Sequence, residues 1–257
     1  MRKLIPIVLL CLWSVQSFAD PVTQEQDTVR KSLFLSGMLS VTNNGFSYVP
    51  AFTLDAPAVF AGVNVEMNRL GFNTEFRYAL SGRPWFLMFV TSYKVVDTPR
   101  TRISLGVHFP GVAFFETPVV VDGEDKVLIE AQQALSPEIN AGFNISEHVA
   151  VGAMYMYFIG LGDAYVKHGH FPALWFRFTG IPIAKDIAFH FNGQVFYLNM
   201  AGDAGYYVAW NLELLKKDFP LSLSTSMYKT IRSEIEGKDF NWNVSLNYVF
   251  GKRYIAQ

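Results

Sequence analysis

The stretch that decides the fold lies near the C-terminus and reads Phe240-Asn-Trp-Asn-Val-Ser-Leu-Asn-Tyr-Val-Phe250. Every even-numbered position in it is apolar, whereas positions 241, 243, 245 and 247 carry Asn or Ser. Successive side chains of a β-strand point to opposite faces, so this strand has one apolar face and one polar face. Aromatic residues stand at both ends of the apolar face, where a transmembrane β-barrel carries its aromatic girdles. The stretch therefore predicts a membrane-spanning strand with a polar lumen behind it.

The N-terminus has the form of a secretory signal peptide. Met1-Arg2-Lys3 is a basic start, an apolar run follows to Trp13, and Ser17-Phe18-Ala19 is a small-x-small cleavage site. The apolar run is too short to span a bilayer as a helix, which disfavours the alternative of an N-terminal membrane anchor. We expect residues 1–19 to be a signal peptide and residues 20–257 to form a single domain.

Composition narrows the classes of partner and of chemistry. The one cysteine, Cys11, lies inside the signal peptide, so the remaining chain has no disulfide, thiolate metal site or cysteine nucleophile. The net charge is −1, with 21 basic and 22 acidic residues, which gives no indication of a nucleic-acid partner. Hydrophobic residues make up 51% of the chain, but no later apolar run is long enough for a transmembrane helix.

Period-2 alternation predicts twelve strands after the signal peptide, and hence an all-β chain. Their ranges are Ser32–Val41, Ala58–Asn68, Phe72–Leu80, Trp85–Val95, Arg100–Phe109, Leu135–Ile145, Val149–Ile159, Phe171–Gly180, Ile187–Asn199, Gly205–Leu215, Leu221–Thr230 and Phe240–Phe250. The predicted architecture is a transmembrane antiparallel up-and-down β-barrel.

The connections between these strands support an even number. Short polar turns, such as Ser146–His148 and Lys216–Asp218, alternate with connections on the other side that are mostly longer, as short periplasmic turns alternate with external loops. A thirteenth strand near Val112–Val121 would put Ser146–His148 on the wrong side of the membrane. We therefore interpret Pro110–Ala134 as one long external loop, within which Val119–Ile129 resembles a hairpin.

The polar faces of the strands must line the lumen, because an Arg on the lipid face near mid-membrane costs about 2–4 kcal/mol. This assigns the titratable candidates for a lumen or ligand path, which are Glu66, Glu75, Arg77, Arg102, His108, Glu138, Arg177, His190 and Glu213. The first four come from neighbouring parts of the wall, and opposite charges among them should pair, since unpaired buried charges are expensive. Two interpretations stay open: the network fills and stiffens the barrel, or the same residues form a path for a ligand or ion.

Two predicted strands, Trp85–Val95 and Val149–Ile159, are apolar on both faces. Phe86, Met88, Met154 and Met156 should therefore face inward. They either pack against a plug or the N-terminal segment, or they form an apolar groove, since flexible Met side chains suit variable apolar partners.

The sequence offers little support for catalysis or metal binding. His108 and Ser104 share a strand face but lie roughly 13 Å apart at strand rise, too far for a hydrogen bond. His190 could meet Ser222 or Ser224 from another strand, but the pattern does not fix this. His168-Gly-His170 is expected in an external loop, and two histidines are weak grounds for a metal site. We assign no catalytic residue, metal or cofactor, and the residues favour a protein that is not an enzyme.

The chain resembles bacterial outer-membrane β-barrel proteins in its signal peptide, alternating strands, short turns such as Ile145–Val149 and aromatic last strand, although Gly251–Gln257 extends past Phe250. The resemblance implies an outer-membrane location, with outer-membrane lipid and the assembly machinery as partners. The first functional hypothesis is a narrow channel or small-ligand uptake protein, whose further partner is a small solute. The alternatives are a packed interaction barrel that acts through its external loops and, less favoured, a lipid-active enzyme. A soluble lipocalin-like sheet is a minor alternative for the fold.

Overall fold

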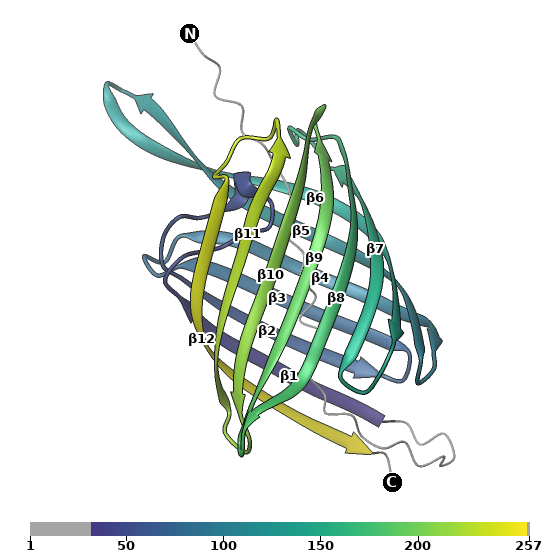
Figure 1. Cartoon of the computed structure of the whole chain (residues 1–257). Helices are drawn as coiled ribbons and strands as arrows, with labels where there is room; N and C mark the ends of the chain where they lie inside the picture. The colour runs from purple at the N-terminus through teal and green to yellow at the C-terminus, as the bar shows by residue number, and fades with distance from the viewer. Residues whose placement is uncertain (1–31, 256–257) are drawn as a thin grey trace.

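The computed structural model describes residues 32–255 (Figure 1). The predicted signal peptide lies outside the described residues. Within them the chain forms β1 (Ser32–Thr42), η1 (Pro50–Phe52), β2 (Ala58–Met67), β3 (Leu70–Ala79), β4 (Pro84–Asp97), β5 (Thr101–Val121), β6 (Glu124–Asn144), β7 (Val149–Gly160), β8 (His168–Ala184), β9 (Ile187–Met200), β10 (Asp203–Lys216), β11 (Leu221–Ser233) and β12 (Phe240–Ile255). Between Ser32 and Ile255, no helix has the length and apolar character to cross a membrane.

The strands close into one antiparallel barrel in which each strand pairs with its neighbours along the chain. The seam joins the first and last strands, from Ser32↔Ile255 to Thr42↔Ser245. Closure leaves no free strand edge in the wall, whereas the projecting part of β5 and β6 is paired only within its own hairpin. The predicted twelve-stranded up-and-down barrel is confirmed, and β12 continues past Phe250 to Ile255, so most of the C-terminal extension is strand rather than tail.

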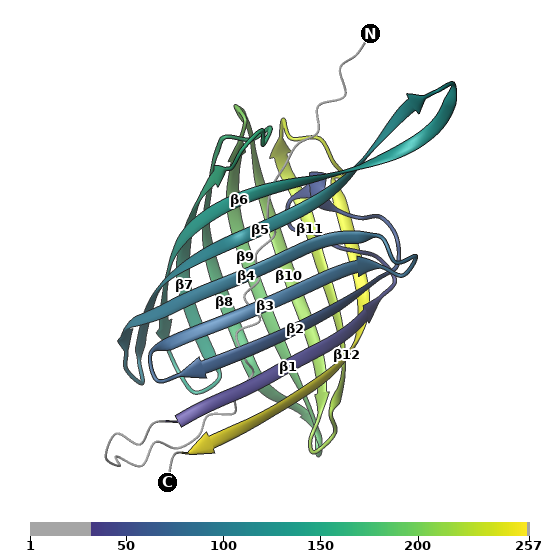
Figure 2. The same cartoon turned by 180° about the vertical axis from the view of Figure 1, so that it is seen from behind.

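The two ends of the barrel differ, as Figures 1 and 2 show. At the end where β1 begins and β12 ends, which we call the turn end, consecutive strands are joined by short turns. At the opposite end, which we call the hairpin end, β5 and β6 project well beyond the rest of the wall. Short turns are typical of the periplasmic end of such barrels. The hairpin end is therefore the end we expect outside the cell.

The segment 110–134, predicted from the sequence as one long external loop, is mostly paired strand. β5 continues to Val121 and β6 starts at Glu124, so the two strands extend as a paired ribbon. Asp122 and Gly123 form the turn with φ of 57° and 78°. Positive φ at both central residues is the requirement of a type I′ hairpin turn, which Asp-Gly meets well. The hairpin expected within the loop is present, but as an extension of strands five and six.

The connection between β1 and β2, residues 43–57, folds into the mouth at the hairpin end, and we call it the plug segment (Figure 1). Phe46 contacts Tyr228 of β11, with ring centroids 5.5 Å apart. On the other side, Phe52 contacts Phe115 of β5 at 5.6 Å, and its carbonyl accepts a 2.8 Å hydrogen bond from Trp85 Nε1. The plug segment therefore spans the mouth from β11 to β4 and β5.

Trp85→Phe should loosen the plug segment without opening the barrel. The substitution keeps an aromatic ring but leaves the buried carbonyl of Phe52 without its donor, at a cost of about 1–3 kcal/mol. Amide hydrogen exchange of residues 43–57 should become roughly 5- to 150-fold faster, while exchange in β1–β12 stays unchanged. Trp210→Phe, on β10, is the matched control. Equal exchange of residues 43–57 in wild type and Trp85→Phe would contradict the role of this hydrogen bond.

The barrel interior as a candidate functional site

The interior near the hairpin end is apolar. The plug residues Phe46, Tyr48, Val49 and Phe52 belong to one cluster with inward side chains of the wall. The wall contributes Trp85, Phe86, Met88, Met156, Phe158, Phe171, Phe196, Leu198, Tyr207 and Tyr228, among others. The prediction that Phe86, Met88 and Met156 face inward is confirmed, and Met154 packs against the same cluster. Of the two interpretations offered for these side chains, packing against a plug is the one that the contacts show.

Toward the turn end the inner wall becomes polar, and a chain of hydrogen bonds crosses four strands. Ser40 Oγ of β1 donates to Asn247 Oδ1 of β12 at 2.7 Å, and Asn247 Nδ2 donates to Ser222 Oγ of β11 at 3.3 Å. Ser222 Oγ in turn donates to Glu213 Oε1 of β10. His190 of β9 lies next along the wall, with its Nδ1 4.0 Å from Glu213 Oε2, which is beyond hydrogen-bond distance. We call these five residues the polar belt.

His108 and Glu138 form a second polar group on the opposite part of the wall. His108 Nε2 lies 3.0 Å from Glu138 Oε2, and Nδ1 lies 3.3 Å from Met88 Sδ. Gly106 lies opposite Glu138 in the ladder, and a Cβ at this position would stand 2.7 Å from Glu138 Oε1. A glycine is therefore required here so that the Glu138 side chain can lie flat across β5 and reach His108.

Two ion pairs lie on β2, β3 and β4, one within β3 and one between β2 and β4. Glu75 and Arg77, two residues apart on the same face of β3, form a buried pair. The Arg77 guanidinium also lies 5.3 Å from the ring of Trp85, a cation–π distance. Glu66 pairs with Lys94 of β4 at 2.8 Å. Lys94 was not predicted as an inward residue, although its even-numbered position places it on the same face of β4 as Phe86 and Met88.

The remaining candidates lie nearer the turn end. Arg102 pairs with Asp97 at 3.1 Å beside the β4–β5 turn, and its side chain is 59% exposed. It therefore does not join Glu66, Glu75 and Arg77 in one network. Arg177 donates from Nε to Asn192 Oδ1 at 2.8 Å and is close enough to Arg102 for electrostatic repulsion. The nine candidates thus separate into local groups rather than one site.

The geometry does not form a nucleophile–base pair from the residues considered for one. Glu213 stands between Ser222 and His190, so the Ser222 hydroxyl gives its hydrogen to a carboxylate and not to the imidazole. A serine nucleophile needs its base within hydrogen-bond reach, with the third group behind the base. Here the carboxylate of Glu213 lies next to the serine and the imidazole of His190 lies behind it, so the base and the third group have exchanged places.

His168-Gly-His170 is also placed differently from the expectation. Both histidines lie at the start of β8 and face outward, not in a loop. In the described part of the chain, residues 32–255, no group of three or more His, Cys, Asp or Glu side chains is arranged to hold a metal ion.

No protein-family model and no curated protein sequence matches this chain. Solved structures do match it. The KdgM porin aligns with a TM-score of 0.52 at 13% identity, covering 84% of this chain and 99% of its own. The KdgM porin in complex with disordered oligogalacturonate aligns with a TM-score of 0.50 at the same identity and coverage. An outer-membrane channel from Pseudomonas putida F1 has a TM-score of 0.49 at 11% identity, covering 91% of this chain and 100% of its own.

Sequence identity this low makes the likeness one of fold. The resemblance drawn from the alternating strands and short turns is confirmed at that level. The closed barrel supports a location in the outer membrane, since closed barrels and helices are the structures that can span a bilayer. This chain has the fold of the bacterial outer-membrane β-barrels.

Proposed function

We propose that this barrel is a narrow outer-membrane channel for small, polar, uncharged solutes. The observation that carries the proposal is the chemistry of the inner wall toward the turn end. The polar belt offers hydroxyl, amide, carboxyl and imidazole groups on five neighbouring strands, and the charges on β2 to β4 are paired as Glu75–Arg77 and Glu66–Lys94. Such a wall can exchange hydrogen bonds with a solute while exerting little net field on an ion.

The size and fold of the barrel agree with this proposal. Eight strands leave an interior just filled by side chains, whereas sixteen or more leave an aqueous channel. Twelve strands fall between these limits and suit a narrow path. The KdgM porin, which shares the fold, has been solved with an oligogalacturonate, so a barrel of this kind can accommodate a carbohydrate.

The plug segment has to move if a solute is to pass. Its apolar side chains cross the mouth at the hairpin end. Two polar contacts join it to the region of β12: the Lys238–Asp55 ion pair at 2.6 Å, and a hydrogen bond of 3.0 Å that Asn241 Nδ2 donates to Thr53 Oγ1. The ion pair is exposed, so it contributes about 0–1 kcal/mol. We therefore assign the plug segment the role of a gate.

Replacing residues 46–53 with a short Gly-Ser linker should open the channel. Gly45 and Leu54 stay paired through the Leu54 N–H donating to the Gly45 carbonyl, so a short linker fits without displacing β1 or β2. Single-channel recording in planar bilayers should show a higher conductance than wild type. A variant with the β5–β6 hairpin shortened is the control and should conduct like wild type. Folded protein that stays closed after loss of the plug residues would exclude the channel.

Charge variants of the Glu75–Arg77 pair should change ion selectivity in opposite directions. In the linker variant, Glu75→Gln leaves the cation of Arg77 uncompensated and should favour anions, whereas Arg77→Gln should favour cations. The double variant should return to the selectivity of its parent, because the two changes cancel. Reversal potentials in a salt gradient measure this directly. Identical reversal potentials in all four proteins would show that the path avoids this pair.

A second candidate is an interaction barrel that acts through the β5–β6 hairpin. The hairpin projects beyond the mouth (Figure 2). It carries exposed apolar side chains, with Val120 70% and Val127 60% exposed. Large exposed apolar side chains on a projecting ribbon are typical of a contact surface.

A photo-crosslinking residue at position 120 should test the interaction candidate. In intact cells it should give one discrete adduct, whereas the same residue at position 165, in the neighbouring β7–β8 connection, should give none. Tyr165 is exposed, so it controls for general accessibility. Absence of an adduct at 120, or equal adducts at both positions, would remove this candidate.

A further inference from the structure

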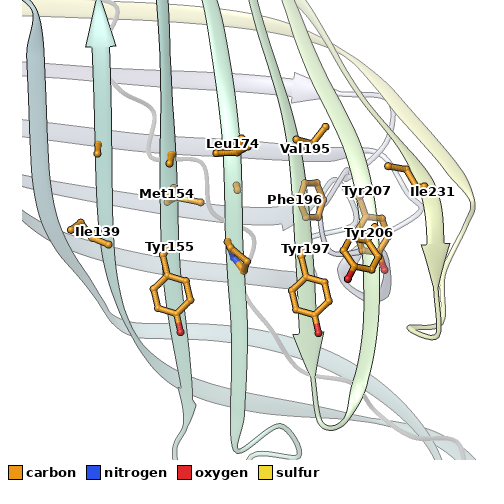
Figure 3. Close-up of a pocket in the computed structure, with 14 residues that line it drawn as sticks. Ile139, Met154, Tyr155, Leu174, Val195, Phe196, Tyr197, Tyr206, Tyr207 and Ile231 are labelled. Atoms are coloured by element: carbon orange, nitrogen blue, oxygen red, sulfur yellow. The ribbon is translucent and has the colours of Figure 1, made fainter.

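A hollow on the outward face of the wall lies across β6 to β11 and has a volume of about 550 Å³ (Figure 3). Its outward lining consists of aliphatic side chains such as Leu174 and Val195 and of tyrosine rings such as Tyr155, whereas Met154, Phe196 and Tyr207, which also border it, turn toward the interior cluster. Because outward side chains of the barrel face lipid, this hollow lies in the membrane and not in the lumen. It is independent of the proposed transport.

The strand register explains its shape. Tyr155 of β7 lies opposite Pro172 of β8, and the pairs His170↔Asn199 and Ala173↔Phe196 place Tyr197 of β9 on the other side of Pro172. Neighbouring strands are about 4.8 Å apart, so the two tyrosines stand about 10 Å apart with only a proline between them. Carbon atoms make contact at about 3.5–4.0 Å. The space between Tyr155 and Tyr197 is therefore a slot that one hydrocarbon chain can fill.

The hollow forms where the outward side chains of β6, β7 and β8 are small, for two reasons. Pro172 has a short, compact side chain, and since it lacks an N–H, the β8–β9 ladder passes over Phe171 and Pro172. Beside it, Ala141 and Ala153 pair across β6 and β7 and are small side chains in the lining of the hollow. A larger side chain at position 172 would fill the space between the two tyrosines, and larger side chains at 141 or 153 would narrow the hollow beside it.

The slot has a polar end. Tyr155 and Tyr197 both point their hydroxyls toward the end of β9, which is the hairpin end (Figure 3). There the Tyr155 hydroxyl lies 2.8 Å from His170 Nδ1, and the Tyr157 hydroxyl lies 2.8 Å from His168 Nδ1. His168, His170 and Pro172 alternate along β8 and share its outward face. In both contacts the engaged atom is Nδ1, so Nε2 of each ring is the atom that can meet a ligand.

We propose that this slot binds a phosphate-bearing lipid of the outer leaflet, with one acyl chain over Pro172 and the phosphate at His168 and His170. The depth agrees with this occupant, because tyrosine hydroxyls gather at the level of the headgroups and the hollow lies on the bilayer side of them. Imidazole is the side chain that gains positive charge near neutral pH, and its N–H donates to a phosphate oxygen. An apolar slot that ends in two imidazoles complements a lipid rather than a free acyl chain.

The test is native mass spectrometry of the folded full-length barrel in detergent, titrated with diphosphorylated lipid A. Pro172→Phe should reduce bound lipid at least tenfold, because the new ring fills the slot. It also supplies the missing N–H, so the barrel should stay folded, as checked by its altered gel mobility before heating. Val63→Phe adds the same ring to the outward face of β2 and should bind lipid A like wild type.

The headgroup part of the proposal has its own measurement. Wild type should bind diphosphorylated lipid A at least tenfold more tightly than lipid A from which the phosphates have been removed. The double variant His168→Ala, His170→Ala should lose this difference and keep binding to the dephosphorylated form. Full lipid binding by Pro172→Phe, or equal loss in Val63→Phe, would overturn the slot. Equal affinity of the wild type for both forms of lipid A would overturn the phosphate site.

Discussion

Closure of the sheet between β1 and β12 is the constraint on which the rest of the structure depends. A bilayer offers no hydrogen-bond partner to a backbone N–H or C=O, so every such group at membrane depth needs a partner in the protein. Twelve antiparallel pairings meet this need for the whole wall. Once the sheet is closed, each strand has one side toward lipid and one toward the interior, and the alternation of side chains follows from that division.

Polar side chains inside the barrel are also removed from bulk water, so they too need hydrogen-bond or ion-pair partners within the protein. The chain meets this need with local pairs such as His108–Glu138 and with short hydrogen-bonded chains such as the one from Ser40 to Glu213. Near the hairpin end it uses the other solution and replaces polar side chains with an apolar cluster built around Phe46 and Phe52. The interior is thus divided between hydrogen bonding and apolar packing, and the boundary between the two lies near Met88, which contacts His108.

Much of this could be predicted from the sequence because alternation reports the local environment of each residue. Phe240–Phe250 shows its two faces directly, and Glu75 and Arg77 face inward as expected. Alternation does not show where the connection between two strands lies, because a connection can extend outward as paired strand or fold into the barrel. Residues 112–121 could be read as a further strand, but the alternation of short and long connections assigns 110–134 to a loop, and the sequence does not show that β5 and β6 extend together as one paired ribbon. The plug segment also could not be placed, since Phe46 and Phe52 sit in an irregular stretch whose fold depends on Tyr228 and Trp85, far along the chain. Pairing partners such as Lys94 for Glu66 depend on register across two strands, which a single sequence leaves open.

The seam has an effect on the order in which the molecule can be completed. Just beyond β1, the Asn43 N–H donates to the Val244 carbonyl, the Val244 N–H donates to Asn43 Oδ1, and Asn44 Nδ2 donates to Asn241 Oδ1. The base of the plug segment is therefore fastened to the last strand to be synthesised. Residues near the start of the chain cannot take their final positions until the final strand has been delivered. Closing the seam and fixing the base of the plug segment therefore depend on the same strand, β12.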